Sequence, residues 1–469
     1  MIFASLLFLY LFLPLNIILY FVFPNIKLKN VVLIAFSLIF YAWGEPVWVL
    51  LLLLTAYLDY RHALTIEKHK GTLKAKTALL LSVFTDIGIF FVFKYSGFVI
   101  SNINMITGLS LYVPKFTLPI GISFYTFQTL TYIIDVYRGK IQAQPKFSKY
   151  ILYLSLYFQL VAGPIVRYSD VAKEIENRNL SVPRFSSGIY RFAVGLGKKV
   201  IIANAAGVFV DKYMSGDITQ LTTVGAWLGI TMYTLQLYYD FSGYSDMAIG
   251  LGKMFGFDFP ENFNYPYISK SVSEFWRRWH ITLGSFFRDY VYIPLGGNRT
   301  KVYRNLFIVW FLTGFWHGAS WNFVIWGLYN GIFIMIERLF KGKLNNIPAF
   351  LKHVYLIVVV EVGFVFFKFE SIRTAVNYIK TMFLGGTSFS SFDVNTEIIN
   401  NIFWIALALI LATPIMKLLE KSYNNSIKSG ISLSVVFDIS RVLLIGLLII
   451  FSTAHLAGNS FNPFLYNAF

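Results

Sequence analysis

A long run without charge is the feature that most constrains how this chain can fold. No Asp, Glu, Lys or Arg occurs between Arg304 and Glu337, and large apolar residues dominate the run. The run is longer than the roughly 20 residues that a helix needs to cross a bilayer core. His317 lies inside it, and an ionisable side chain at membrane depth costs a few kcal/mol or more. Because imidazole transfers protons near neutral pH, we interpret His317 as a candidate functional residue.

The composition indicates an integral membrane protein of the all-α class. Hydrophobic residues make up 57% of the chain and charged residues 13%, whereas a soluble protein carries about a quarter charged residues. The apolar runs lack the alternation of period two that marks a membrane barrel, so helices span the bilayer. The net charge of +17 comes from short basic loops, which excludes nucleic acid as a partner and leaves membrane lipid. The chain has no cysteine, and its histidines lack the spacing of a metal site, so we predict none.

The distribution of basic residues predicts the orientation of the first spans. Three basic loops fall on the same side of the membrane, namely those after the first, third and fifth spans. Basic loops stay in the cytoplasm, so we expect a multi-pass protein of the cytoplasmic (inner) membrane with an extracytoplasmic N-terminus. The five predicted spans are 2–23, Asn30–Trp43, Val47–Leu58, Thr77–Ile100 and Leu118–Val136.

We expect a single membrane domain over residues 1–469 with three parts. Residues 1–150 hold the regular N-terminal spans, 151–340 an irregular catalytic core, and 341–469 the C-terminal spans. The core is interrupted at Gly163-Pro164, at Gly195–Lys199 and along 256–270. Interrupted apolar segments are typical of re-entrant helices. The C-terminal spans are expected near 354–367, 402–416 and 442–456.

A group of polar side chains precedes the two main motifs of the core. Tyr239, Asp240, Ser242 and Tyr244 lie in an apolar surrounding. One interpretation is that they hydrogen-bond helices together, and the other is that they line a substrate path. Elsewhere Asp86, Asp135 and Glu361 lie in apolar runs, where we expect hydrogen-bond partners in the bundle, with a relay role as the alternative.

Residues 271–290 predict an amphipathic interfacial helix that begins at a capping box, Ser271–Glu274. Its apolar face carries Trp276 and Trp279, and its polar face carries Arg277, Arg278, Arg288 and Asp289. The basic face suits an anionic donor such as a phosphate-bearing thioester, or anionic lipid head groups. His280 falls at the edge of the apolar face, where a structural and a functional role are both open.

His317 is set in a different environment. Trp316 and Trp321 flank it, Asn322 follows, and the nearby glycines allow close backbone approach. Desolvation favours the neutral imidazole, which can accept a proton at physiological pH.

Five motifs together resemble the membrane-bound O-acyltransferase (MBOAT) family, in its alginate O-acetyltransferase branch. They are YDFSGYSDMAIG (239–250), PENFN (260–264), FWRRWH (275–280), FRDYVYIPLGGNR (287–299) and GFWHGASW (314–321). The resemblance covers the chain from about Leu118 to Pro463–Tyr466. The branch that transfers D-alanine to teichoic acids is similar through Tyr290 but departs after it.

The resemblance implies a fold and a site. The fold would be a ring of transmembrane helices, with re-entrant and interfacial helices, around a thin central tunnel. His317 would be the catalytic histidine and His280 the second functional one. The residues that would bind the donor or line the tunnel are Trp276, Arg277, Arg278, Trp279, Arg288, Asp289, Trp316, Trp321, Asn322, Tyr239, Asp240, Ser242 and Tyr244.

The implied activity is O-acyl transfer across the membrane. No cofactor would be bound, and the donor would be acetyl-CoA or an acyl-carrier thioester on the cytoplasmic side. The acetyl group would move to a hydroxyl of an extracytoplasmic polysaccharide or to a partner acetyltransferase. The alternatives are D-alanyl transfer to teichoic acid from an acyl-carrier protein, a transporter or flippase, and a scaffold without activity.

Overall fold

The computed structural model describes residues 1–161, 163–344, 346–428 and 433–458, and these contain helices and no β-strand. Seven helical segments among them are long and apolar enough to cross a membrane: Ile26–Gly44, Trp48–Lys68, Leu73–Thr107, Val182–Met214, Ala349–Lys368, Phe392–Leu411 and Val435–Gly458. The chain is therefore an all-α, multi-pass membrane protein, which confirms the predicted fold class. The resemblance predicted at Pro463–Tyr466 lies outside the described residues.

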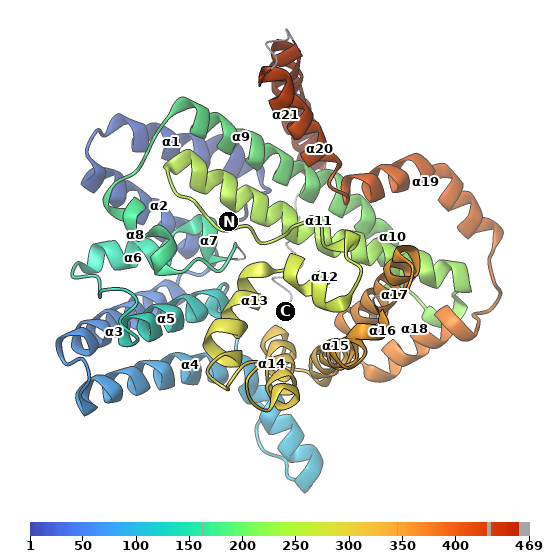
Figure 1. Cartoon of the computed structure of the whole chain (residues 1–469), viewed down its shortest axis with the longest axis horizontal. Coiled ribbons are helices and arrows are strands. Elements are labelled where there is room, and N and C mark those ends of the chain that lie inside the picture. Colours follow the sequence, from blue (N-terminus) through green and yellow to red (C-terminus); the bar gives the residue numbers. More distant parts are fainter. Residues whose placement is uncertain (162, 345, 429–432, 459–469) are drawn as a thin grey trace. The chain divides into compact units, whose positions relative to one another are not determined.

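The described residues form two compact units that alternate along the chain. Unit 1 consists of residues 1–192 and 244–261. Its elements are η1 (Phe8–Phe12), α1 (Leu13–Val22), α2 (Ile26–Gly44), α3 (Trp48–Lys68), α4 (Leu73–Thr107), α5 (Ile122–Tyr137), α6 (Phe147–Ser155), α7 (Tyr157–Leu160), α8 (Tyr168–Glu176), most of α9 (Val182–Gly197) and the end of α11 (Thr223–Phe255). Within this unit α3, α4 and α5 pack side by side (Figure 1).

Unit 2 consists of residues 193–243 and 262–458 among those described. Besides the end of α9 and the start of α11, it holds η2 (Lys198–Ala203), α10 (Asn204–Met214), η3 (Ile218–Gln220), η4 (Pro266–Ile268), α12 (Val272–Arg278), α13 (Ile281–Phe287), η5 (Arg288–Tyr292), α14 (Val302–His317), α15 (Trp321–Leu339), α16 (Lys341–Leu344), α17 (Ala349–Lys368), α18 (Ile372–Leu384), α19 (Phe392–Leu411), α20 (Ile415–Lys428) and α21 (Leu433–Gly458). The prediction of a single domain stays a prediction.

Most predicted spans correspond to observed helices. Helices α2, α3 and α4 match the second to fourth spans, and α17, α19 and α21 match the three C-terminal ones. The first span, expected over 2–23, is a shorter apolar helix over Phe8–Val22. The fifth span corresponds to α5, which has 16 residues.

One predicted interruption is wrong. The chain does not break at Gly195–Lys199, because α9, η2 and α10 run as one helical segment over Val182–Met214. The glycines serve close packing instead: a Cβ on Gly197 would lie 2.7 Å from a methyl carbon of Leu448, and one on Gly243 would lie 2.7 Å from the Gly195 carbonyl oxygen. The interruption along 256–270 is confirmed, since only η4 is helical there.

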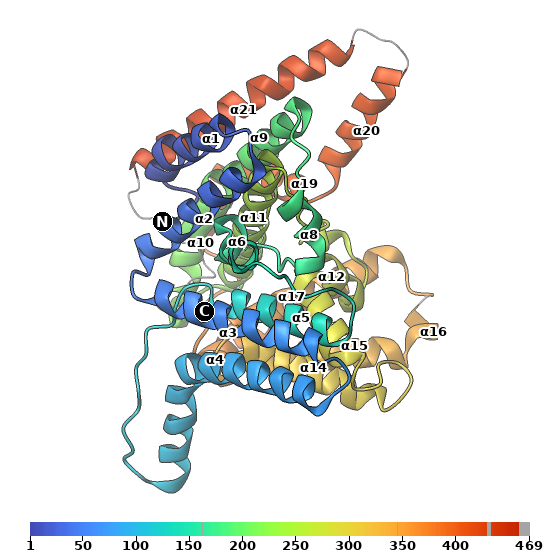
Figure 2. The same cartoon turned by 90° about the vertical axis from the view of Figure 1, so that its left-hand side faces the viewer.

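Helix α4 has 35 residues and extends to Thr107, into the predicted loop. Figure 2 shows that it bends along its length, so that its last turns run in a different direction. Ser96 and Gly97 lie in this helix, and the Ser96 hydroxyl donates to the carbonyl of Val92 at 2.5 Å. Gly/Ser pairs and such back-bonded serines are known causes of helix bends.

Candidate active site

Helices α14 and α15 form a tightly packed hairpin that carries His317 at its turn (Figure 1). His317 is the last residue of α14, and Gly318–Ser320 connects it to α15. The two helices approach closely through glycines: a Cβ on Gly314 would lie 2.3 Å from the carbonyl oxygen of Phe323. The hairpin therefore holds the His317 backbone at a fixed, crowded position.

The His317 side chain is buried among aromatic rings from three helices. Its exposed fraction is 4%. Its ring centroid lies 4.9 Å from that of Trp316, 4.8 Å from that of Trp326 on α15, and 5.3 Å from that of Phe367 on α17. All three contacts are edge-on, a usual arrangement of packed aromatic rings. These rings exclude water from most of the imidazole.

His280 lies at a break in the predicted amphipathic helix, which therefore forms two helical halves and not one continuous helix. The chain forms α12, then a residue with φ of 44° at His280, then α13 and η5. The break has a tertiary cause, because residues 262–264 hydrogen-bond to the chain on both sides of it. The backbone N–H of Asn264 donates to the carbonyl of Arg278 at 2.9 Å, and that of Ile281 to Asn262 at 3.0 Å. The N-cap half of the predicted capping box is confirmed, since the Ser271 hydroxyl accepts from the Glu274 N–H at 3.0 Å. The Glu274 carboxylate accepts from the N–H of Lys270 at 3.0 Å, one residue before the predicted partner.

The hydrogen bonds of Asn262 determine which nitrogen of His280 carries the proton. The amide oxygen of Asn262 accepts from the Thr282 N–H at 3.2 Å and from the Thr282 hydroxyl at 2.8 Å. A backbone N–H only donates, so this atom is the oxygen and not the nitrogen. His280 Nδ1 lies 3.1 Å from the same oxygen, so Nδ1 is the donor. The neutral imidazole therefore carries its lone pair on Nε2.

The indole of Trp316 brings the two histidines into one cluster. Its ring centroid lies 6.2 Å from that of His280 and 4.9 Å from that of His317. Phe241 packs edge-on against His280 at 4.8 Å. We call the group His280, His317, Trp316, Phe241, Asn262, Trp326 and Phe367 the histidine cluster, and all of it belongs to unit 2.

Burial makes His280 a weak base. The side chain is 2% exposed, and loss of hydration lowers the pKa of its imidazole to about 3. Desolvation disfavours the charged form of a histidine. His280 is therefore neutral at physiological pH and suits hydrogen bonding better than holding a proton.

Trp276 of α12 and Trp279, which directly follows α12, belong to an aromatic layer next to the cluster. The Trp276 indole N–H donates to Asn330 on α15 at 3.1 Å, and its ring lies 5.5 Å from that of Trp326. The carboxylate of Glu337 on α15 accepts hydrogen bonds from the N–H groups of Val272 and Ser273. A carboxylate at a helix N-terminus stabilises it, so α15 anchors the helix that presents both tryptophans.

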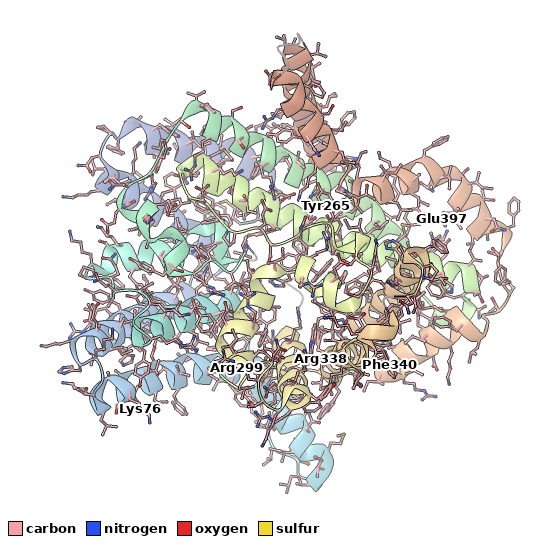
Figure 3. The ribbon with its side chains drawn as sticks, viewed as in Figure 1. Lys76, Tyr265, Arg299, Arg338, Phe340 and Glu397 are labelled. Atoms are coloured by element: carbon pink, nitrogen blue, oxygen red, sulfur yellow. The ribbon has the colours of Figure 1, made fainter. Side chains whose placement is uncertain are left out.

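The predicted basic face is at the surface. Arg277 is exposed, Arg278 pairs with Glu274 at 2.9 Å, and Arg288 pairs with Asp289 at 2.7 Å. Figure 3 labels two further basic residues, Arg299 and Arg338, and Arg338 donates to the neighbouring Asn298 at 3.0 Å. This part of unit 2 thus offers several cations to an anionic group.

Other predicted site residues have contacts outside the cluster. Tyr239 donates to the carbonyl of Ala408 at 2.5 Å, and Asp240 forms a buried ion pair with Lys199 at 2.5 Å. Asn322 donates to the carbonyl of Phe369, and half of the Trp321 side chain is exposed. These bonds of Tyr239 and Asp240 fit the interpretation that polar groups join helices.

The remaining two residues of that motif differ in their surroundings. Ser242 is buried in unit 2, one position after Phe241 of the cluster. Tyr244 belongs to unit 1, where its ring stacks on Phe3 at 4.7 Å.

Five residues of this region were not singled out as site residues: Phe241, Asn262, Trp326, Phe367 and Glu337. Phe241 lies within the YDFSGYSDMAIG motif. Asn262 lies within the PENFN motif, which was a signal, but its role depends on contact with a residue 18 positions away. The other three come from α15 and α17 and carry no local signal. Among the described residues, no group of three or more His, Cys, Asp and Glu side chains could hold a metal ion.

Taken together, the fold and the cluster define a multi-pass helical membrane protein with two buried histidines around one indole. The sequence profile of the membrane-bound O-acyltransferase family matches residues 36–376. The chain belongs to this family of O-acyltransferases, and the match begins before the predicted start at Leu118.

Relatives with more specific names also align. A probable alginate O-acetylase AlgI of Pseudomonas putida is 38% identical over the whole of both chains. A peptidoglycan O-acetyltransferase of Helicobacter pylori is 34% identical over 81% of this chain and 80% of its own. A teichoic acid D-alanyltransferase of Bacillus subtilis is 30% identical over 53% of this chain and 67% of its own.

Proposed function

We propose that this protein transfers an acetyl group from a cytoplasmic thioester to a hydroxyl on the far side of the cytoplasmic membrane. The acceptor is a cell-envelope polysaccharide or a partner acetyltransferase that completes delivery. The similarity to the alginate O-acetylase over the whole chain supports this activity. The observation that carries it is the pair of buried histidines in contact with Trp316.

In this proposal His317 acts as the general base. Its imidazole takes the proton of the acceptor hydroxyl as the oxygen attacks the thioester carbonyl. The bond between oxygen and the acyl carbon forms, the bond between carbon and sulfur breaks, and the departing thiolate takes the proton back from the imidazolium. Positioned proton transfer of this kind contributes about 10²–10⁴-fold in rate.

His280 has a positioning role in the proposal. Asn262 orients the ring so that Nε2 presents a lone pair, and a neutral imidazole can accept a hydrogen bond from a substrate group. Alignment of two reactants at one site supplies much of the remaining acceleration.

We infer that the donor is acetyl-CoA, whose phosphates suit the exposed cations of α12 and the following loop. Trp276, Trp279, Trp316, Trp321 and Asn322 of unit 2 would line the donor and acceptor paths toward the cluster, as the family resemblance implies. The proposal also includes the predicted tunnel, an N-terminus on the extracytoplasmic side and a partner acetyltransferase.

D-alanyl transfer from an acyl-carrier protein to teichoic acid is the second candidate. The similarity to a teichoic acid D-alanyltransferase favours it, although that similarity covers about half of this chain.

The test measures acyl groups released by mild base from the envelope. Cells would carry the wild-type protein, His317→Ala, the control His455→Ala or no gene. His455 is an exposed histidine of α21 outside the cluster. We expect acetate release to fall equally in His317→Ala and in the deletion, and to stay at the wild-type level in His455→Ala.

Other outcomes would decide against parts of the proposal. Loss of D-alanine in place of acetate would select the second candidate. Suppose that acetate release is lost in the deletion but is normal in His317→Ala cells that contain a normal amount of the protein. His317 would then have no catalytic role, and the protein would be a transporter or a scaffold.

A further inference from the structure

A pocket in unit 1 lies where the end of α1, the start of α9 and the end of α11 meet, outside the histidine cluster (Figure 1). Its volume of about 340 Å³ falls within the range of about 300–1,000 Å³ that ligand sites span. Helix α9 begins a candidate membrane span at Val182, so the pocket lies at one end of that span. Its polar lining residues are Ser181 and Lys253, and its apolar ones are Phe21, Leu180, Val182, Phe185 and Met254.

The helices around the pocket are already in contact, so they cannot move together to fill it. A Cβ on Gly188 of α9 would lie 2.9 Å from the backbone nitrogen of Met254 on α11. The rings of Phe21 and Phe185 pack edge-on with centroids 5.6 Å apart, which joins α1 to α9. Val182 is 83% exposed, so the mouth of the pocket opens to the surroundings of the protein. A ligand can therefore enter a preformed site from outside.

Two lysines border the pocket. Lys253 lines it and is half-buried. The ammonium of Lys29 on α2 lies 5.2 Å from the ring centroid of Phe21, a lining residue, and 4.9 Å from that of Tyr20, and Lys29 is 8% exposed. Within the part of the chain that the structure describes, neither lysine forms an ion pair with a carboxylate. Because a buried charge without an opposite charge is costly, an anion at this point would stabilise the folded protein.

A third cation lies beside the same tyrosine ring. The guanidinium carbon of Arg178 is 5.8 Å from the ring centroid of Tyr20. Its hydrogen bonds go to neutral acceptors, which are the Tyr20 hydroxyl at 2.9 Å, the backbone carbonyl of Glu174 at 2.8 Å and the side-chain oxygen of Asn30. Lys29 and Arg178 therefore place two positive charges around one ring, where they repel each other.

The charge and the apolar walls together select one class of ligand. The nearby carboxylate of Asp258 pairs with Arg184 at 2.8 Å, so it leaves the charge of the other cations in place. A small soluble anion would leave the apolar walls of the pocket in water, and a lipid without net charge would leave the cations without a counter-charge. An anionic phospholipid satisfies both requirements, because its phosphate pairs with basic residues at the membrane surface while its acyl chain is apolar.

We propose that unit 1 binds one anionic phospholipid, whose phosphate contacts Lys29 and Lys253 and whose acyl chain occupies the pocket. Arg178 is held by its own hydrogen bonds and adds positive charge to the site. The bound lipid joins α1, α9 and α11 at the membrane surface and stabilises the folded state that binds it. The site is separate from the histidine cluster, and its test does not depend on the proposed function.

Native mass spectrometry of the full-length protein tests this proposal, because it resolves the binding of single lipid molecules. The protein is purified in detergent and titrated with phosphatidylglycerol, which is anionic, or with phosphatidylcholine of the same acyl chains, which is zwitterionic. We expect the first phosphatidylglycerol to bind more tightly than phosphatidylcholine. Lys29→Met and Lys253→Met should each weaken its binding about fivefold, because each removes one cation from the phosphate and keeps an unbranched side chain.

Two further variants are controls. Lys27→Met removes an exposed lysine of the same helix that does not line the pocket, and Lys253→Arg retains the charge, so both should bind phosphatidylglycerol like the wild type. Equal affinities for the two lipids, or wild-type affinity in both Lys29→Met and Lys253→Met, would overturn the proposal. Equally tight binding of glycerophosphoglycerol, the same head group without acyl chains, would replace the lipid by a soluble anion.

Discussion

At the scale of single residues, His280 shows how backbone and neighbours decide what a side chain can do. Its left-handed backbone ends one helix and starts the next. Asn262 then fixes the ring, and burial keeps it neutral. A histidine held in this way serves as a hydrogen-bond acceptor, whereas the base in the proposed reaction is His317.

The lowered pKa of His280 predicts that the folded protein loses stability in acid. The unfolded chain binds a proton near pH 6.5 while the folded state does not until about pH 3, so stability falls with pH between these values. When the pH falls from about 7.5 to about 5.5, this group alone lowers the free energy of unfolding by about 1.4 kcal/mol. His280→Asn, which tolerates the same backbone, should lower this acid-induced loss.

Thermal unfolding of the detergent-purified protein at the two pH values measures this effect. His69→Asn is the control, since His69 ends α3 outside the cluster, and it should lose as much stability in acid as the wild type. Equal acid losses in His280→Asn and the wild type would mean that His280 is protonated in the folded state.

Sequence alone singled out His317, because an ionisable group in an apolar run stands out locally, and it left a structural and a functional role open for His280. It did not identify Trp326 or Phe367, which are apolar residues in apolar helices and differ from their neighbours only in what they touch. Contacts between distant segments carry no local pattern.

At the scale of elements, the break between α12 and α13 was missed for the same reason. The helical periodicity of 271–290 is genuine, and each half forms a helix with its apolar residues buried. Hydrogen bonds from residues 262–264 replace those that a continuous helix would make at Arg278–Ile281. The periodicity of a sequence predicts which face of a helix is buried. It does not predict that another segment of the chain will form hydrogen bonds with the backbone and break the helix.

The glycines of the α14–α15 hairpin give a prediction at this scale. Gly314→Ala adds a methyl group 2.3 Å from a backbone oxygen, and overpacking of this kind costs about 1–3 kcal/mol. Gly446→Ala in α21 is the matched control, since a Cβ there has no neighbour within 4 Å. We expect it to be neutral or to stabilise by up to about 1 kcal/mol, because alanine favours a helix over glycine.

The unfolding midpoints of the two variants provide the measurement. A lower unfolding midpoint for Gly314→Ala supports the tight hairpin, provided that the midpoint of Gly446→Ala does not fall. If both variants unfold like the wild type, the two helices have room to separate at Gly314.

At the scale of the whole molecule, composition and charge were enough to predict a multi-pass helical protein and most of its spans. Apolar runs define spans because the bilayer requires them, whatever the tertiary contacts. Boundaries were less accurate where the run of apolar residues and the helix differ, as at α1 and α4. The interruption predicted at Gly195–Lys199 is wrong because the glycines there permit close packing and do not break the helical segment over 182–214.

The predicted orientation can be measured on the natural sequence, because the chain has no cysteine. A membrane-impermeant thiol reagent applied to intact cells should label Tyr112→Cys, which lies in the exposed segment after α4. Lys70→Cys, between α3 and α4, should be labelled only after the cells are opened. The reverse pattern would invert the proposed topology and place the N-terminus in the cytoplasm.

The backbone at position 280 also has an evolutionary consequence. Its φ of 44° admits glycine, asparagine, aspartate and histidine far more readily than other residues, and strongly disfavours β-branched ones. The residue types that selection can retain at this position are therefore limited by the left-handed backbone conformation, whether or not the side chain takes part in catalysis. Among related chains that keep this break, we expect an exchange of histidine for asparagine to be the readiest polar substitution, because it preserves both the backbone and a hydrogen-bonding side chain.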